Sequence, residues 1–149
     1  MRVSAVIAAG GQGTRVGGDA PKQLQDLGGE TLLSMAIKPF DECRRVDEIV
    51  IVLPETVTEA EAALCIQIDT PLRLVSGGSR RQDSVALGVD NVCKDADVVL
   101  VHDAARPFCT VSLIEKVIDA TIEAGAVVPA IQVIDTVKKA DVIDTKGVR

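Results

Sequence analysis

The stretch "VSAVIAAGGQGTRVGGDAPKQ", residues Val3 to Gln23, contains the change of pattern that decides the fold class. It opens with the continuous apolar run Val3–Ile7, which is typical of a strand buried on both faces of a parallel sheet. Five glycines follow, and two cations, Arg15 and Lys22, lie among them and just beyond them. Ligands bind at the carboxyl ends of strands in open α/β sheets, so this stretch predicts a strand leading into an anion-binding loop. An ordinary tight turn would explain the glycines alone equally well.

Apolar runs of strand length alternate with helix-like segments along the rest of the chain. The strand-like runs are residues 3–7, 48–53, 72–75, 98–101 and 126–134. Helical spacing of apolar residues occurs at 32–40, 58–68, 82–92 and 110–124, and Gly125 is a helix stop signal. This alternation predicts an α/β fold, a Rossmann-like and mostly parallel sheet with helices on both faces. A length of 149 residues is typical of a single domain.

The composition argues against several classes of partner. A net charge of −6 and only two aromatic residues disfavour nucleic-acid binding. Four scattered cysteines and a single histidine disfavour a zinc site and are typical of reduced thiols in a cytoplasmic protein. No run approaches the roughly 18 apolar residues of a membrane span, and the N-terminus lacks signal-peptide features. We therefore predict a cytoplasmic protein that binds small anionic molecules, with no nucleic-acid or membrane partner.

Two familiar phosphate-loop patterns fail on the glycine stretch. The Walker pattern GxxxxGK[ST] is absent, and the dinucleotide fingerprint requires a third glycine where Val16 stands. The next predicted strand also ends too late, at Pro54-Glu55, to supply the fingerprint acid. A dinucleotide-binding oxidoreductase domain is thus disfavoured. The pattern that remains is G-x-G-T-R followed by P-K, over residues 11–22.

This pattern resembles the signature loop of the sugar-phosphate nucleotidyltransferases. Three further strings, GGSRRQDSV (77–85), VHDAARP (101–107) and DTVKKA (135–140), follow in the order typical of the 2-C-methyl-D-erythritol 4-phosphate cytidylyltransferase family. The resemblance implies the nucleotide-diphospho-sugar transferase type of fold, with a β-arm near the C-terminus. It also implies an enzyme that transfers CMP from CTP to 2-C-methyl-D-erythritol 4-phosphate, releases pyrophosphate and serves non-mevalonate isoprenoid biosynthesis.

The same resemblance assigns site residues position by position. Arg15 and Lys22 match the catalytic cations. Asp103 matches a ligand of Mg²⁺, a hard cation that favours carboxylate and phosphate oxygens. Arg106, Asp135 and Thr136 match acceptor-binding positions. The nucleotide-binding positions are Ala9, Gly10, Gly11, Gly13, Thr14, Gly77, Gly78, Arg81, Ser84, Asp103 and Ala104.

The residues themselves fit this chemistry. A phosphate monoester has a second pKa near 6, so the attacking group is mostly dianionic at neutral pH and needs no general base. The reaction instead needs charge cancellation and in-line positioning. We therefore expect His102 to be structural. Seven of the sixteen Lys and Arg residues fall in loops at suspected strand ends, where they would focus positive potential: Arg15, Lys22, Arg80, Arg81, Arg106, Lys138 and Lys139.

Structural alternatives remain open at four motifs. Arg15 and Lys22 could be solvated loop cations. Asp103 could be a helix N-cap or an ion-pair partner of Arg106. Gly77-Gly78 could be only a turn, with Ser84 a first-turn helix residue. Asp135-Thr136 could be a strand-ending turn.

Departures from the family pattern leave two functional alternatives. The family usually reads Pro-Ala-Ala-Gly where this chain has Ala8-Ala9-Gly10-Gly11, a version found in ribitol-5-phosphate cytidylyltransferases. Ala105 and the lysines after Asp135-Thr136 favour the methylerythritol substrate instead. Family members continue past Arg149, so we expect residues 1–149 to be one C-terminally incomplete domain, with 135–149 beginning a homodimer arm. A truncated CTP-binding module without turnover is the other alternative.

Overall fold

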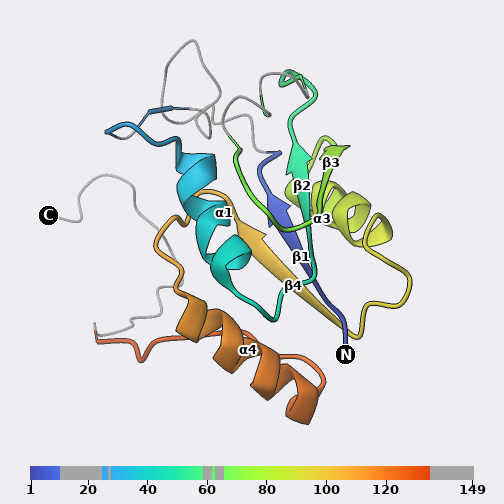
Figure 1. The fold of residues 1–149 in the computed structure, drawn as a ribbon, viewed down its shortest axis with the longest axis vertical. Helices are drawn as coiled ribbons and strands as arrows, with labels where there is room; N and C mark the ends of the chain where they lie inside the picture. The colour runs from blue at the N-terminus through green and yellow to red at the C-terminus, as the bar shows by residue number, and fades with distance from the viewer. Residues whose placement is uncertain (11–24, 27, 59–61, 63–65, 135–149) are drawn as a thin grey trace, which may run out of the picture.

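The computed structural model describes residues 1–10, 25–26, 28–58, 62 and 66–134. Four strands and three helices follow one another in this part of the chain (Figure 1). They are β1 (Val3–Ala8), α1 (Leu32–Glu42), β2 (Glu48–Leu53), β3 (Leu72–Ser76), α3 (Arg81–Asp90), β4 (Val98–Asp103) and α4 (Val111–Ala124). The predicted α/β class is confirmed.

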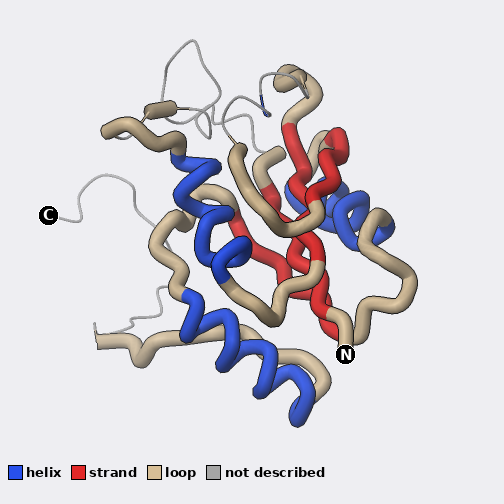
Figure 2. Tube along the Cα trace, viewed as in Figure 1, coloured by secondary structure: helices blue, strands red, loops and turns tan. Residues whose placement is uncertain are grey.

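The four strands form one parallel sheet in the order β3-β2-β1-β4. Figure 2 shows helices on both sides of it. On one face Ile7, Ile49 and Ile51 pack in a buried cluster with apolar residues of α1 and α4. On the other face Val6 and Val50 belong to a smaller cluster beneath α3. Burial on both faces explains why these strands read as continuous apolar runs.

Capping residues determine where two of the helices begin and end. Thr31 Oγ1 accepts a hydrogen bond from the Ser34 N–H at 3.1 Å, and Thr110 Oγ1 accepts one from the Leu113 N–H at 3.2 Å. Gly125 follows α4 with a φ of 82°, a conformation that glycine adopts without strain. Among the described residues, no helix has the length and apolar character needed to cross a membrane.

Helix α3 approaches the sheet closely because it carries a glycine at its contact point. A Cβ on Gly88 would lie 2.8 Å from Cγ2 of Val52 and would also collide with Cγ1 of Val6. Glycine inside a helix costs about 1 kcal/mol relative to alanine. The close packing requires glycine at this position, because a Cβ would prevent the helix backbone from contacting Val6 and Val52.

A buried carboxylate ties the amino ends of two strands to the loop before β4. Glu48 Oε1 accepts hydrogen bonds from Ser4 Oγ at 2.5 Å and from the Cys93 N–H at 2.6 Å, and Oε2 accepts one from Cys93 Sγ at 3.1 Å. Burial alone raises the pKa of Glu48, but the hydrogen bonds from Ser4 and Cys93 outweigh it and leave the pKa below its usual value. The same carboxylate raises the pKa of the Cys93 thiol.

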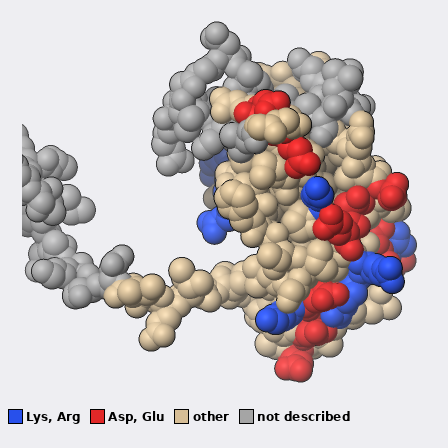
Figure 3. All heavy atoms as spheres, turned by 60° about the vertical axis from the view of Figure 1, so that its left-hand side comes forward, with Lys and Arg blue, Asp and Glu red and all other residues tan. Residues whose placement is uncertain are grey.

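The structure differs from the sequence prediction in segment 126–134, and it describes only part of the predicted helix 58–68. The predicted strand 126–134 was wrong, because these residues form no strand in the structure. The segment leaves the body of the molecule (Figure 3), and Val128, Ile131 and Ile134 are each more than 85% exposed. An apolar run does not specify a pairing partner, and Pro129 has no N–H to donate to a ladder. Of the predicted helix 58–68, Ala62 is helical and its N–H donates to the Thr58 carbonyl at 3.1 Å, while residues 66–68 are not helical. Residues 59–61 and 63–65 lie outside the described residues.

We predict that Gly88→Ala destabilises the protein although alanine is the better helix former. The new methyl group has no room against Val6 and Val52, and overpacking of this kind typically costs about 1–3 kcal/mol. Urea denaturation measures the change in the free energy of unfolding. Gln82→Ala, at an exposed position of the same helix, is the control and should change it by less than about 0.5 kcal/mol. Equal stability of Gly88→Ala and wild type would contradict the close approach.

Acidification should weaken the Glu48 network. Because the folded-state pKa of Glu48 is lowered, its contribution to stability is complete above the unfolded pKa of about 4.3 and is lost as the pH falls through the folded value. Glu48→Gln should therefore lower the free energy of unfolding at pH 7 by about 1–3 kcal/mol and lower it less at pH 3. Glu55→Gln, an exposed carboxylate, is the matched control. A penalty for Glu48→Gln that is the same at both pH values would show that the charge is unimportant.

Candidate functional site

The described site residues gather where β1 and β4 end side by side. Ala8 of β1 lies opposite Asp103 of β4, and the Ala104 N–H donates to the Ala8 carbonyl at 3.1 Å. From β1 the chain builds β2 and β3 on one side and returns to place β4 on the other side. Ligands in open α/β sheets bind at such a reversal of strand order, outside the carboxyl ends of the strands.

Ser84 joins the end of β1, the end of β3 and the start of α3. Its side chain is buried, and Oγ accepts a hydrogen bond from the Gly78 N–H at 3.1 Å and lies 3.2 Å from the Arg80 carbonyl, to which it can donate. A Cβ on Gly10 or on Gly77 would lie only 2.9 Å from this oxygen. Gly10, Gly77 and Gly78, three of the glycines predicted for nucleotide binding, therefore present bare backbone around a buried hydroxyl.

Asp103, the predicted metal ligand, is held by two arginines. Its Oδ1 accepts from Arg81 Nε at 2.9 Å and from Arg81 Nη2, and Arg106 Nε lies 3.4 Å from Oδ2. The Arg106 ion pair, which the sequence left as an alternative, is present. The Arg81 contact was not foreseen, since 22 positions separate the two residues and no spacing rule links them.

The neighbouring Arg80 points elsewhere. Its Nε and Nη2 donate to the two carboxylate oxygens of Asp83, at 2.9 and 2.8 Å. These hydrogen bonds hold the pKa of Asp83 below its usual range. Of the two consecutive arginines at the start of α3, only Arg81 reaches Asp103.

His102 has structural contacts, as expected. Its Nε2 lies 2.9 Å from the Arg106 carbonyl, a geometry in which the ring donates a hydrogen bond, and the ring lies 5.0 Å from that of Phe40. Burial lowers the pKa of His102, so the imidazole is neutral at pH 7. The side chain orients the loop that carries Arg106.

Some of the predicted site residues fall in segments that the structure does not describe. Those outside the described residues are Gly11, Gly13, Thr14, Arg15, Lys22, Asp135 and Thr136. Within the described part, Ala9, Gly10, Gly77, Gly78, Arg81, Ser84, Asp103, Ala104 and Arg106 lie at the carboxyl edge of the sheet. That part contains no group of three or more His, Cys, Asp or Glu residues able to hold a metal ion.

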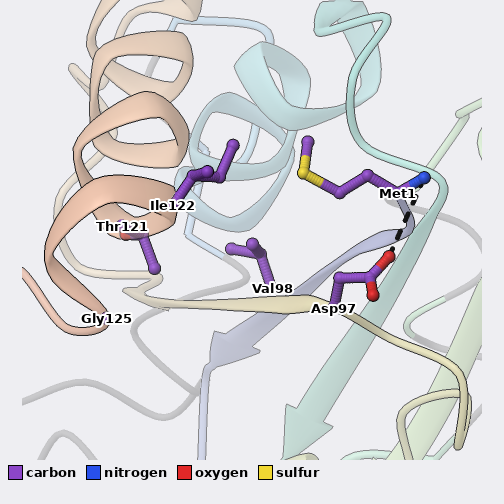
Figure 4. A pocket seen from close by; sticks show the side chains of 6 residues that line it. All are labelled: Met1, Asp97, Val98, Thr121, Ile122 and Gly125. Atoms are coloured by element: carbon purple, nitrogen blue, oxygen red, sulfur yellow. Dashed lines mark ion pairs between the residues drawn. The ribbon is translucent and has the colours of Figure 1, made fainter.

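The opposite edge of the sheet has a different character. A hollow of about 490 Å³ lies beside the amino ends of β1 and β4, between Met1, Asp97, Val98 and the end of α4 (Figure 4). The N-terminal ammonium lies 3.8 Å from Asp97 within it. None of the predicted site residues within the described part of the chain lines this hollow.

Comparison with known proteins gives consistent matches along the chain. A family model described as IspD, 2-C-methyl-D-erythritol 4-phosphate cytidylyltransferase, matches residues 3–147. The 2-C-methyl-D-erythritol 4-phosphate cytidylyltransferase of Rhodococcus jostii is 41% identical over 143 residues, covering 95% of this chain and 61% of that protein. The bifunctional enzyme IspD/IspF of Nitrobacter winogradskyi is 41% identical over 144 residues, covering 94% of this chain and 35% of that protein.

A solved structure agrees with these matches. The 4-diphosphocytidyl-2C-methyl-D-erythritol synthase of Anaerococcus prevotii superposes with a TM-score of 0.68 at 26% identity, over 80% of this chain and 50% of that one. The chain therefore spans about a third to three-fifths of the length of the relatives it matches.

The packing of Gly10 against Ser84 can be tested by a double-mutant cycle. Gly10→Ala should lower the melting temperature in the wild-type background, because its methyl group meets Ser84 Oγ. In a Ser84→Ala background the same change should cost less, with a coupling energy of about 0.5–3 kcal/mol. Ser79→Ala, at an exposed serine of the same loop, provides the control background. Additive effects of Gly10→Ala and Ser84→Ala would contradict the contact.

Proposed function

The chain belongs to the 2-C-methyl-D-erythritol 4-phosphate cytidylyltransferase family, and from that premise we propose that it transfers CMP from CTP to 2-C-methyl-D-erythritol 4-phosphate. An oxygen of the acceptor phosphate forms a bond to the α-phosphorus of CTP, the bond to the bridging oxygen breaks, and pyrophosphate leaves with the electron pair. The observation that carries the proposal is the meeting of a glycine-lined backbone with the Asp103–Arg81–Arg106 cluster at the reversal of strand order.

The described residues suit a reaction that depends on charge compensation. The acceptor phosphate supplies its own dianionic nucleophile, so no general base is required. His102, which is neutral and engaged with the Arg106 carbonyl, is accordingly kept out of the chemistry. Arg15 and Lys22 are proposed to neutralise the charge that develops as two anions meet, and Arg106, Asp135 and Thr136 to hold the acceptor.

Nucleotide recognition is proposed for the backbone around Ser84. Because Ser84 Oγ already binds the Gly78 N–H, its role is to shape the surface of Gly77 and Gly78 against which a small pyrimidine could lie. Ala9, Gly10, Gly11, Gly13 and Thr14 would hold the triphosphate, and Ala104 would lie near the ribose. Arg81 belongs to the same nucleotide site.

Asp103 is the proposed magnesium ligand. A single carboxylate at a strand end suits Mg²⁺, which is commonly held by one or two carboxylates together with substrate phosphates. When bound, Mg²⁺ supplies neutralisation of phosphate charge. We further propose a cytoplasmic homodimer in which residues 135–149 begin the arm between subunits.

The proposal predicts CTP-dependent release of pyrophosphate with 2-C-methyl-D-erythritol 4-phosphate and Mg²⁺. Arg15→Ala and Lys22→Ala should each lower turnover by about 10²–10³-fold, because each removes one preorganised charge. The melting temperature should change little. Arg44→Ala, an exposed arginine before β2, should leave both quantities unchanged.

Three other outcomes would contradict the proposal. Release of pyrophosphate with ribitol 5-phosphate alone would indicate the other cytidylyltransferase activity. Thermal stabilisation by CTP and Mg²⁺ without turnover on either polyol phosphate would indicate a binding module. Parallel losses of stability and turnover in Arg15→Ala and Lys22→Ala would remove their catalytic assignment.

A further inference from the structure

We infer that Arg81 is a positioning residue that couples metal binding to nucleotide binding. Its guanidinium binds Asp103 in the structure, and when a divalent cation takes that carboxylate the guanidinium transfers to a phosphate oxygen of the nucleotide. This inference rests on the proposed function, since it deepens the role of the same site.

Asp103 contacts an arginine through each of its two carboxylate oxygens. Arg81, the first residue of α3, places both Nε and Nη2 on Oδ1, while Arg106 lies against Oδ2. Both carboxylate oxygens therefore face a guanidinium. A metal ion that coordinates Asp103 through Oδ1 has to displace Arg81, because that oxygen already accepts two hydrogen bonds and has no lone pair left for coordination.

The Arg81 side chain is more exposed to solvent than the carboxylate that it contacts. The Arg81 side chain is 65% exposed, whereas that of Asp103 is 27% exposed. Ion pairs with a solvent-exposed partner contribute little to stability, so this one can exchange without opening the core. Arg81 can thus move while the carboxylate, at the end of β4 where it pairs with β1, stays in place.

The charges around Asp103 do not balance. Two guanidinium groups beside one carboxylate give this cluster, Arg81–Asp103–Arg106, an excess of one positive charge. Such a cluster repels a free dication and attracts a triphosphate. When cation and triphosphate arrive together, Arg81 exchanges a carboxylate for a phosphate, which a planar guanidinium binds equally well through two N–H groups.

The neighbouring arginines do not share this role. Arg80 is bound to both oxygens of Asp83 and does not reach Asp103. Arg106 makes a longer contact of 3.4 Å within its own loop. The coupling is therefore expected to be specific to Arg81. Arg80→Gln, which changes the adjacent arginine, provides a matched control.

The test measures binding and does not depend on turnover. Mn²⁺, detected by electron paramagnetic resonance, is titrated into the full chain with and without a CTP analogue carrying a methylene between the α- and β-phosphorus atoms. For wild type, Mn²⁺ should bind more tightly with the analogue, by a factor of about 5–150, and the analogue should gain the same factor from Mn²⁺. Arg80→Gln should match wild type.

Arg81→Gln should change both the affinity for Mn²⁺ alone and the enhancement of that affinity by the analogue. Mn²⁺ alone should bind several-fold more tightly because the carboxylate is released, and the enhancement by the analogue should shrink several-fold. Arg81→Lys, which keeps the charge but not the two-nitrogen fork, should lie between the two and covers the case in which Arg81→Gln does not fold. Asp103→Asn should abolish Mn²⁺ binding in every background.

Two results would overturn the inference. If Mn²⁺ alone binds Arg81→Gln no more tightly than wild type, Arg81 is a structural tether between α3 and β4. If that happens while wild type releases pyrophosphate from CTP, the proposed function stands and only the coupling fails. If neither wild type nor Arg81→Gln binds Mn²⁺ or the analogue, both proposals fail together.

Discussion

Strand β1 hydrogen-bonds in parallel to β2 along one edge and to β4 along the other, and the described site depends on that double pairing. The register sets Ala8 beside both Val52 and Asp103, so the β1 loop and the β4 carboxylate emerge together. The pairing also makes β1 the point where strand order reverses. Helix α3 completes the arrangement, because Gly88 lets it lie close enough for Ser84 to meet Gly10.

Charge is distributed unevenly between the two ends of the sheet. At the amino end, Asp47 and Asp97 accept hydrogen bonds from the backbone N–H groups of Val3 and Arg2, and Glu48 is buried. At the carboxyl end, guanidinium groups outnumber carboxylates around Asp103. The net charge of −6 therefore says little about the ligand, since the local potential at the strand ends governs what binds.

The sequence predicted what local pattern determines and missed what pairing determines. Strands β1, β2 and β4 and the helix stop at Gly125 were readable because burial and capping leave signals in neighbouring residues. Segment 126–134 was misread because an apolar run does not name its partner. Gly88 carries no local signal of close packing, since a helix-interior glycine reads only as a weak point. The Arg81–Asp103 contact depends on two distant segments and the reversal of strand order.

The protein has to fold with the charged side chains of the proposed site close together. Preorganised cations repel one another, and a carboxylate among them offsets that repulsion. Pairing Arg81 and Arg106 with Asp103 satisfies both groups within the protein. In the proposed coupling, these exposed contacts are exchanged for contacts with a cation and a nucleotide phosphate. The ion pairs at this edge of the sheet would then favour binding of the cation and the nucleotide together.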